Sequence, residues 1–494
     1  MALLDRRTFV KLCAKAAATP AAWADVTQRP GTKQVNRPNI LWLMTDEQRP
    51  DSLGCYGSAW AKTPALDAVA KRGTVFATAI TPSPVCMPAR TCVLTGRYPH
   101  GTGIWHNTRT QGIDADHLLE PFHAAGYRSA SFGKQHHALD GRVFDHVEGI
   151  GERDQAVGCL AYREPYDGDD YQQVQYPGPV KWILAGRYPQ GPESRCEYKV
   201  VDRCINWLEQ RDADQPFFLR ASFPGPHTPV TPPQPFDQLI DDEAIKLPPE
   251  GETLPEPCPD SIAKKLAATH TASVLDAEQI KRMRRHYYGN VAFLDQQFGR
   301  LLDWMDRKGL LDNTIIVFNS DHGTHLGDYN LVQKESFFEP VVNVPFFLAL
   351  PGSMTAERGR TIKTPLSAMS LMPTLLDLAG LELPEGLEAP SLASVVRGGK
   401  APDARPIFSE ISRGGPHPFF ARNNIPLPEA MATKTHHAMV REGRWKFMMT
   451  LEAGAEEYAL FDLEADPYER RNLAADAAHA QTCARLAEAI REAQ

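Results

Sequence analysis

Hydrophobic and polar positions along the chain divide it into short apolar runs and longer segments with helical periodicity. Buried strands are predicted at 39–45, 127–132, 217–222, 314–319 and 344–350. Helices are predicted at 64–72, 117–125, about 276–306 and 367–378, with Thr63 as cap and Pro64 in the first turn of the first one. Such alternation is typical of an α/β fold built on a large mixed, mostly parallel sheet flanked by helices.

The pattern changes after residue 381, where Pro384, Gly386 and Pro390 indicate a boundary. Residues 37–381 are predicted to form the main α/β domain and residues 382–494 a smaller antiparallel α+β domain. The smaller domain has strand-like pieces at 438–440 and 445–450 and a final helix from about residue 474. Segments 151–195 and 231–275 are rich in proline, glycine and acidic residues, so we expect them to form the walls of a cleft.

Chemically capable side chains follow the predicted strands at the points where those strands end. They are Asp46, Lys134 and His136, His227, and the pair Asp321 and His322. In open α/β sheets ligands bind at the carboxyl ends of the strands. The sequence therefore predicts that these side chains meet in one site.

Composition narrows the classes of partner. The chain has 494 residues, 42% hydrophobic and 23% charged, with 53 Lys+Arg against 61 Asp+Glu and a net charge of −8. It is therefore long enough for a deep core. It has no basic tract of the kind that binds nucleic acid, and no apolar run long enough to form a transmembrane segment.

Residues 1–24 resemble a bacterial twin-arginine signal peptide. Arg6 and Arg7 precede an alanine-rich stretch that ends in the cleavage-site-like sequence Ala22-Trp23-Ala24. This predicts export to the periplasm; if the signal is not functional, the segment is an amphipathic helix of a cytoplasmic protein. The nine cysteines contain no CxxC pair, which argues against a zinc ribbon.

The sequence from Cys86 to Gly96, with the pattern C-x-P-x-R ending at Arg90, carries the most specific signal. Other matching segments are Pro38-Asn39-Ile40-Leu41, Gly54-Cys55-Tyr56-Gly57, Thr63-Pro64-Ala65-Leu66-Asp67, Ser320-Asp321-His322-Gly323 and Asp466-Pro467 to Asn472-Leu473. Together they resemble the sulfatases of the alkaline-phosphatase superfamily, over about Arg37 to Leu473.

The resemblance implies that Cys86 is oxidised to formylglycine by a maturation enzyme, which would be a partner of this protein. The hydrated aldehyde attacks sulfur with one hydroxyl and releases sulfate by collapse through the other, which is covalent catalysis. Arg90 would hold the formylglycine. Taken alone, Cys86 also fits a buried thiol in a loop.

Five further residues receive roles through the resemblance. Lys134 and Lys334 would contact sulfate, and His136 would orient the nucleophile. His227 would contact sulfate and protonate the departing oxygen, since a near-neutral pKa suits that step. Asn107 would border the pocket. Lys334 equally fits a solvated surface lysine.

The same resemblance implies one divalent metal ion held by Asp46, Glu47, Asp321, His322 and an oxygen of the converted Cys86. Oxygen ligands suit Ca²⁺, our first expectation, or Mg²⁺. Many sulfatases have Asp-Asp where this chain has Asp46-Glu47, and Asp-Asn where it has Asp321-His322. Because an imidazole ligand favours borderline metals, Mn²⁺ is a further alternative.

The sequence thus predicts a sulfuric ester hydrolase that cleaves carbohydrate or aryl sulfate monoesters. One alternative is a phosphonate monoester or phosphodiester hydrolase with the same nucleophile. A second is a non-catalytic binder of sulfated glycans in which Cys86 is unconverted, and a third is an ordinary phosphatase that uses Ser83 or Thr91.

Overall fold

The computed structural model describes residues 37–494, apart from several internal segments. These are 108–112, 140–142, 151–169, 176–180, 242, 244, 246, 249–253, 256–257, 259–274, 355–357, 414–434 and 453. The predicted signal peptide lies outside the described residues, as does much of the two predicted cleft-wall segments.

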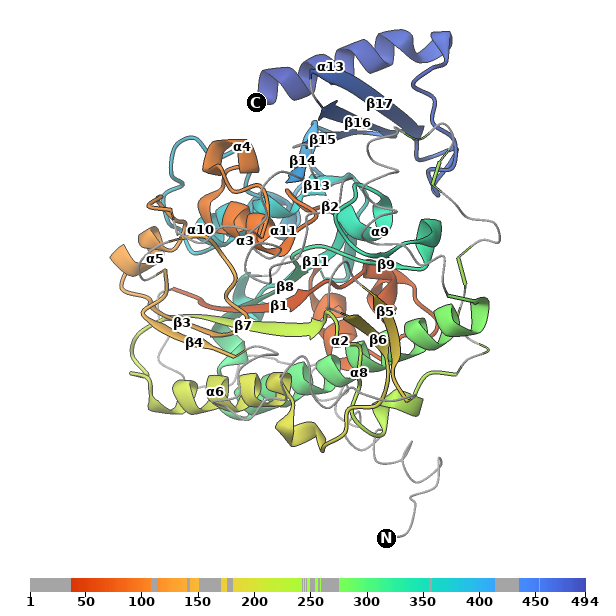
Figure 1. Ribbon diagram of the computed structural model, residues 1–494. Helices are drawn as coiled ribbons and strands as arrows, with labels where there is room; N and C mark the ends of the chain where they lie inside the picture. Colours follow the sequence, from red (N-terminus) through yellow and green to blue (C-terminus); the bar gives the residue numbers. More distant parts are fainter. Residues whose placement is uncertain are drawn as a thin grey trace.

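A nine-stranded mixed sheet forms the centre of the described structure (Figure 1). Its order is β12 (Arg360–Ile362), β2 (Thr74–Ile80), β11 (Asn343–Ala349), β8 (Thr314–Ser320), β1 (Asn39–Asp46), β7 (Phe217–Pro226), β3 (Arg128–Gly133) and β4 (His146–Gly149), with β13 (Leu366–Ser367) also paired to β2. Strands β8, β1, β7, β3 and β4 are parallel. Strand β11 is antiparallel to both β8 and β2. The predicted mostly parallel α/β fold is therefore confirmed.

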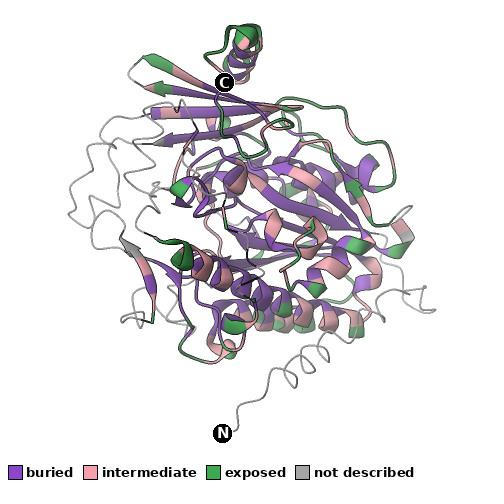
Figure 2. Ribbon diagram, turned by 90° about the vertical axis from the view of Figure 1, so that its right-hand side faces the viewer, coloured by how far each residue is buried: buried purple, intermediate pink, exposed green. Residues whose placement is uncertain are grey.

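Helices cover both faces of this sheet. Helices α2 (Pro64–Arg72), α6 (Cys196–Gln210) and α8 (Ala277–Arg307) pack on one face, and α3 (Cys86–Thr95), α5 (Glu120–Ala124), α10 (Leu371–Leu378) and α11 (Ala393–Val396) pack on the other. Alternate residues of β1 serve the two layers: Leu41 and Leu43 face α8, and Ile40, Trp42 and Met44 face the opposite core. Residues 40–44 are therefore all apolar, and every residue of β1 is buried. Figure 2 shows that the strands at the centre of the molecule are buried.

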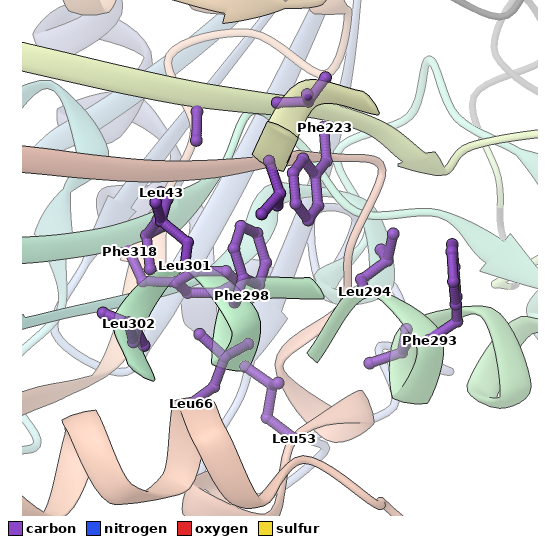
Figure 3. Packing of buried hydrophobic residues seen from close by; sticks show 14 of the residues in the cluster. Leu43, Leu53, Leu66, Phe223, Phe293, Leu294, Phe298, Leu301, Leu302 and Phe318 are labelled. Atoms are coloured by element: carbon purple, nitrogen blue, oxygen red, sulfur yellow. The ribbon is translucent and has the colours of Figure 1, made fainter. Parts of the chain in front are cut away.

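Aromatic packing fixes the long helix α8 against the sheet (Figure 3). Phe298 stacks on Phe223 with ring centroids 4.1 Å apart and contacts Phe318 edge-on at 5.8 Å. The helix begins with a capping box in which the Asp276 side chain accepts from the backbone N–H of Gln279. Strands β7 and β8 are thus held by the same helix, next to the ends from which the site residues project.

A separate four-stranded antiparallel sheet forms the C-terminal part of the molecule, at the top of Figure 1. It consists of β14 (Ile407–Arg413), β15 (Thr435–Glu442), β16 (Trp445–Glu452) and β17 (Ala455–Asp462), covered by α13 (Ala480–Ala493). This confirms the predicted smaller α+β domain. The boundary after residue 381 stays a prediction, and α11, which lies beyond it, packs with the core of the large sheet.

Several predicted elements differ from the structure in extent. The helix predicted at 117–125 is only Glu120–Ala124, with Pro121 in its first turn. The helix predicted at 367–378 starts at Leu371, because Leu366 and Ser367 pair with β2 as strand β13. Thr63 is at the N-cap position of α2, but its hydroxyl bonds Gly54 N and Asp67 instead of capping the helix. The last helix begins at Ala480 instead of near residue 474.

The remaining elements are short. Strands β5 (Gln172–Gln175) and β6 (Lys181–Ala185) form a hairpin in the predicted cleft-wall segment, and β9 (His325–Leu326) pairs with β10 (Val332–Gln333). Helices α4 (Pro99–Thr102) and α9 (Glu339–Val342) are single turns. Among the described residues, no helix combines the length and the apolar character needed to span a membrane.

An ion cluster around His100 joins the two sheets. His100, in α4, places Nδ1 2.8 Å from Glu410 Oε1 on β14 and Nε2 3.3 Å from Glu388 Oε1. The hydrogen bond to Glu388, which has the larger effect, and the hydrogen bond to Glu410 raise the pKa of His100 to about 10. The imidazolium is therefore the form present at neutral pH, and it links the large domain to the first strand of the small one.

We predict that His100→Gln lowers the melting temperature most at neutral and lower pH. Because the folded-state pKa is raised, the stabilisation is complete below the ordinary value of about 6.5 and is lost as the pH rises through about 10. Thermal melts should show a gap in melting temperature between wild type and His100→Gln that closes toward high pH. The control is His146→Gln, at an exposed position of β4. A gap that stays constant from pH 6 to 10 would contradict this assignment.

Candidate active site

The predicted site residues converge where the parallel strands of the large sheet end. Asp46 is the last residue of β1, and Asp321 and His322 follow β8 directly. Lys134 follows β3 and His227 follows β7. Parallel pairing of these strands brings their carboxyl ends together, as the sequence predicted.

Cys86 is the first residue of helix α3 and is almost fully buried. Its backbone therefore lies at the positive end of the helix dipole, where anions are stabilised. Asn107 Oδ1 accepts a hydrogen bond of 2.9 Å from the next backbone N–H, that of Met87. Asn107 thus lies beside Cys86, where it fixes the start of the helix.

Arg90 lies one turn further along α3 and is completely buried between two carboxylates. Its Nε donates to Asp321 Oδ2 at 2.7 Å and one terminal nitrogen donates to Asp46 Oδ2 at 3.1 Å. The other terminal nitrogen donates to Lys134 O at 3.0 Å and to Ser222 Oγ at 2.9 Å. One guanidinium therefore joins the ends of β1, β3, β7 and β8, a geometry that a lysine could not reproduce.

Four buried side chains form a group suited to a metal ion. Ligand atoms of Asp46, Cys86, Asp321 and His322 all lie within 4.8 Å of one another. The Nδ1 of His322 lies 2.8 Å from Gly323 O, which identifies it as the protonated nitrogen, so Nε2 faces Cys86 Sγ at 3.1 Å. Burial lowers the pKa of His322, but Asp321 and Cys86 together outweigh burial and raise that pKa to about 9, so an ion binding at Nε2 would displace a proton.

Two lysines reach the Cys86 thiol from opposite parts of the chain. Lys134 Nζ lies 3.9 Å from Cys86 Sγ and also contacts Asp46. Lys334 Nζ lies 3.4 Å from the same sulfur. Burial and Asp46 act to raise the pKa of the thiol, but the lysines and His322 outweigh them, and that pKa lies well below its ordinary value. The site is therefore built to hold negative charge at residue 86. The alternative of a solvated Lys334 is wrong, because this lysine is 6% exposed.

Glu47 faces a different set of groups from those around Arg90. One oxygen, Oε2, lies 3.3 Å from Lys334 Nζ and 3.4 Å from His227 Nε2, and the other accepts from Thr324 Oγ1 at 2.7 Å. Glu47 forms a second candidate ligand group with Asp46 and His227. Its predicted role as a metal ligand stays a prediction.

His136 approaches Cys86 from the loop after β3, with a positive φ of 39°. Burial lowers the pKa of His136, and its hydrogen bond with the Cys86 side chain acts in the opposite direction. A neutral imidazole here can accept a proton from a group at residue 86. The neighbouring His137, for which no role is predicted, has a pKa lowered to about 3 by burial and by Arg220.

Sequence reasoning missed three residues that support the site. Ser222 accepts from Arg90 and donates to Lys134 O at 2.7 Å, and Thr324 holds Glu47. Glu335, next to Lys334, pairs with His106 Nε2 at 3.1 Å. Single serine, threonine and glutamate residues outside a motif carry no pattern that would have identified them, although Ser222 does lie in a predicted strand.

Comparison with known proteins gives the family. Residues 38–381 match the model of the Sulfatase family, and residues 327–494 match "N-sulphoglucosamine sulphohydrolase, C-terminal". An arylsulfatase of Clostridium perfringens (strain 13 / Type A) is 29% identical, covering 88% of this chain and 90% of its own. An ulvan-active sulfatase of Formosa agariphila is 30% identical, covering 88% of this chain and 77% of its own.

The fold agrees with this assignment. The crystal structure of the phosphonate monoester hydrolase of Agrobacterium radiobacter superposes with a TM-score of 0.75 at 25% identity, covering 92% of this chain and 95% of that one. The similarity therefore includes both the large sheet and the C-terminal domain. By sequence and by fold, the chain belongs to the sulfatase family of the alkaline-phosphatase superfamily and is a hydrolase of sulfate esters.

Proposed function

We propose that this protein hydrolyses carbohydrate or aryl sulfate monoesters at the S–O bond, with formylglycine made from Cys86 as the nucleophile. The observation that carries the proposal is the convergence of Lys134, Lys334, His322 and Asp46 on the sulfur of Cys86. That sulfur stands where the oxygen of a converted residue would lie. When formed, the hydrated aldehyde supplies an attacking hydroxyl and a second hydroxyl through which sulfate is released.

Two cations near the sulfur of Cys86 support the binding of a sulfate group at residue 86. Lys134 and Lys334 approach the sulfur at 3.9 and 3.4 Å. The cluster around Cys86 raises the pKa of Lys334 well above its usual value, although burial opposes this, so its ammonium stays charged. Fixed positive charges aimed at the oxygens of a transferring group are worth more in a buried site than in water.

His136 and His227 are assigned the proton transfers. Burial lowers the pKa of His136, so its imidazole is neutral, and its closeness to Cys86 suits it to orient the nucleophile and take its proton. His227 has Nδ1 2.7 Å from Thr228 O, so its other nitrogen, Nε2, faces Glu47. From there it would donate a proton to the departing oxygen.

The donor set at the strand ends fits one divalent ion. Asp46, Asp321 and His322 would hold it with an oxygen at residue 86, and Glu47 is a further candidate; such an ion would neutralise charge on the sulfate oxygens. Carboxylate oxygens favour Ca²⁺ or Mg²⁺, and the imidazole also admits Mn²⁺.

The substrate class, maturation and location are also proposals. An arylsulfatase and an ulvan-active sulfatase among the relatives support aryl or carbohydrate sulfates. A formylglycine-generating enzyme would act on C-x-P-x-R, and the predicted signal at residues 1–24 would direct the protein to the periplasm. The likeness to a phosphonate monoester hydrolase favours that activity as the second candidate.

The nucleophile is tested on protein co-expressed with a formylglycine-generating enzyme. We expect mass spectrometry of the tryptic peptide containing residue 86 to show the aldehyde, and 4-nitrophenyl sulfate to be hydrolysed faster than an aryl phosphonate monoester. Cys86→Ala should abolish turnover. Full activity in Cys86→Ala would instead support a phosphatase that uses Ser83 or Thr91.

Other results would select the remaining alternatives. A higher kcat/KM for the phosphonate would favour the second candidate. An unmodified thiol after co-expression, together with binding but no hydrolysis of sulfated glycans, would favour a non-catalytic binder.

The metal site is tested by calorimetric titration of metal-stripped protein with Ca²⁺. Asp321→Asn should weaken Ca²⁺ binding by about 10–100-fold or more, the loss of metal affinity typical when ligands or their partners are disturbed. Asp312→Asn is the matched control, because Asp312 lies at the other end of β8. Equal affinities for both variants and wild type would refute the assigned ligands.

A further inference from the structure

A buried ion cluster connects the C-terminal sheet to the segment that carries Lys334. Lys446, on β16, is completely buried, and its Nζ lies 2.7 Å from both Glu469 Oε1 and Glu339 Oε1. The same nitrogen donates to the backbone carbonyl of Phe337 at 2.8 Å. Phe337 is only three residues after Lys334, so the cluster holds the chain directly behind the site.

Glu469 contacts both ends of the segment 329–339, which carries Lys334. Its second oxygen accepts from the backbone N–H of Glu339 at 2.8 Å and lies 3.3 Å from the hydroxyl of Tyr329. That hydroxyl also donates to Tyr468 O at 2.9 Å. Residues 329 and 339 are therefore both fixed by the loop after β17, and Lys334 lies midway between them.

The backbone between these two anchors is strained. Tyr329, Asn330, Gln333 and Glu335 all have positive φ, between 55° and 72°, although none is glycine. Two of them flank Lys334 directly. Such conformations persist only where the surrounding structure enforces them, and they concentrate at functional sites. On its own, the segment would therefore relax and move the Lys334 side chain.

We propose that Lys446, with Glu469, is a positioning residue that holds Lys334 against residue 86. The proposal rests on the proposed function for the role of Lys334 itself. It assigns the C-terminal domain a part in catalysis although Lys446 touches no reacting group. Stability alone is a weak reason for such a cluster, since well-packed apolar residues commonly replace a buried ion pair without loss.

The test is a double-mutant cycle between the two lysines. Lys446→Met/Glu469→Gln removes one ammonium and one carboxylate, while Glu339 keeps Arg441 as an ion-pair partner at 3.7 Å. The double variant is combined with Lys334→Ala. Phe447→Leu is the matched control, because Phe447 is the next residue of β16 and packs on the opposite face of the sheet, under α13. The readouts are kcat/KM for the hydrolysed ester and the Kd for inorganic sulfate.

We expect the Lys446→Met/Glu469→Gln protein to lose about 10–100-fold in kcat/KM, since a displacement of about 1 Å can cost 10²-fold. In the Lys334→Ala background the same change should cost nothing further. Losses that multiply in the combined variant, or a control that loses as much, would overturn the proposal.

Amide hydrogen exchange separates this proposal from the proposed function. Exchange in residues 327–338 should accelerate in Lys446→Met/Glu469→Gln and stay unchanged in Phe447→Leu, whichever ester the protein hydrolyses. Unchanged exchange in both variants would refute the positioning role. Failure to bind sulfate with the exchange effect intact would refute only the proposed role of Lys334.

Discussion

The bridge that Arg90 makes between Asp46 and Asp321 is the interaction on which the rest of the site depends. The two carboxylates end adjacent parallel strands and are fully buried, so without a cation between them their charges would oppose folding. Arg90 pairs with both and ties them to helix α3, and Lys134 supplies a second positive charge at Asp46. Because Cys86 lies one turn before Arg90, the same bridge places Cys86 beside the carboxylates at the strand ends. One side chain therefore links two strands of the sheet to helix α3 and to the buried carboxylates at the strand ends.

Charge is distributed unevenly around residue 86, which gives the site its chemical character. Asp46, Asp321 and His322 lie within reach of Cys86 at the strand ends, and the ammonium groups of Lys134 and Lys334 also reach its sulfur. Asp46 stays ionised, because Lys134, His227 and Arg90 lower its pKa well below the usual range against the effect of burial. Negative groups can thus hold a cation while the lysines hold an anion, as hydrolysis of a charged ester requires.

Much of this arrangement could be predicted from the sequence. Continuous apolar runs identified β1 and β8 almost to the residue, and the rule for strand ends correctly brought Asp46, Lys134, His227 and Asp321 together. Strand β2 was missed because it follows α2 after a single glycine, and β14 and β17 because their apolar positions are mixed with charged ones. The contacts of Glu47 were also missed, because its positive φ leaves no local pattern in the sequence. The cluster at Lys446 was missed because its residues pair across domains, which leaves no local pattern either.

In the proposed mechanism, residue 86 is converted, faces the ion, and lies between the strand-end ligands and the two lysines. A crystal structure of the converted protein grown with Ca²⁺ and soaked with sulfate tests it most directly. The account predicts the ion on Asp46, Asp321 and His322 with an oxygen of residue 86, and sulfate held by Lys134 and Lys334. An ion or sulfate bound elsewhere, with residue 86 turned away from Asp46 and Asp321, would contradict it.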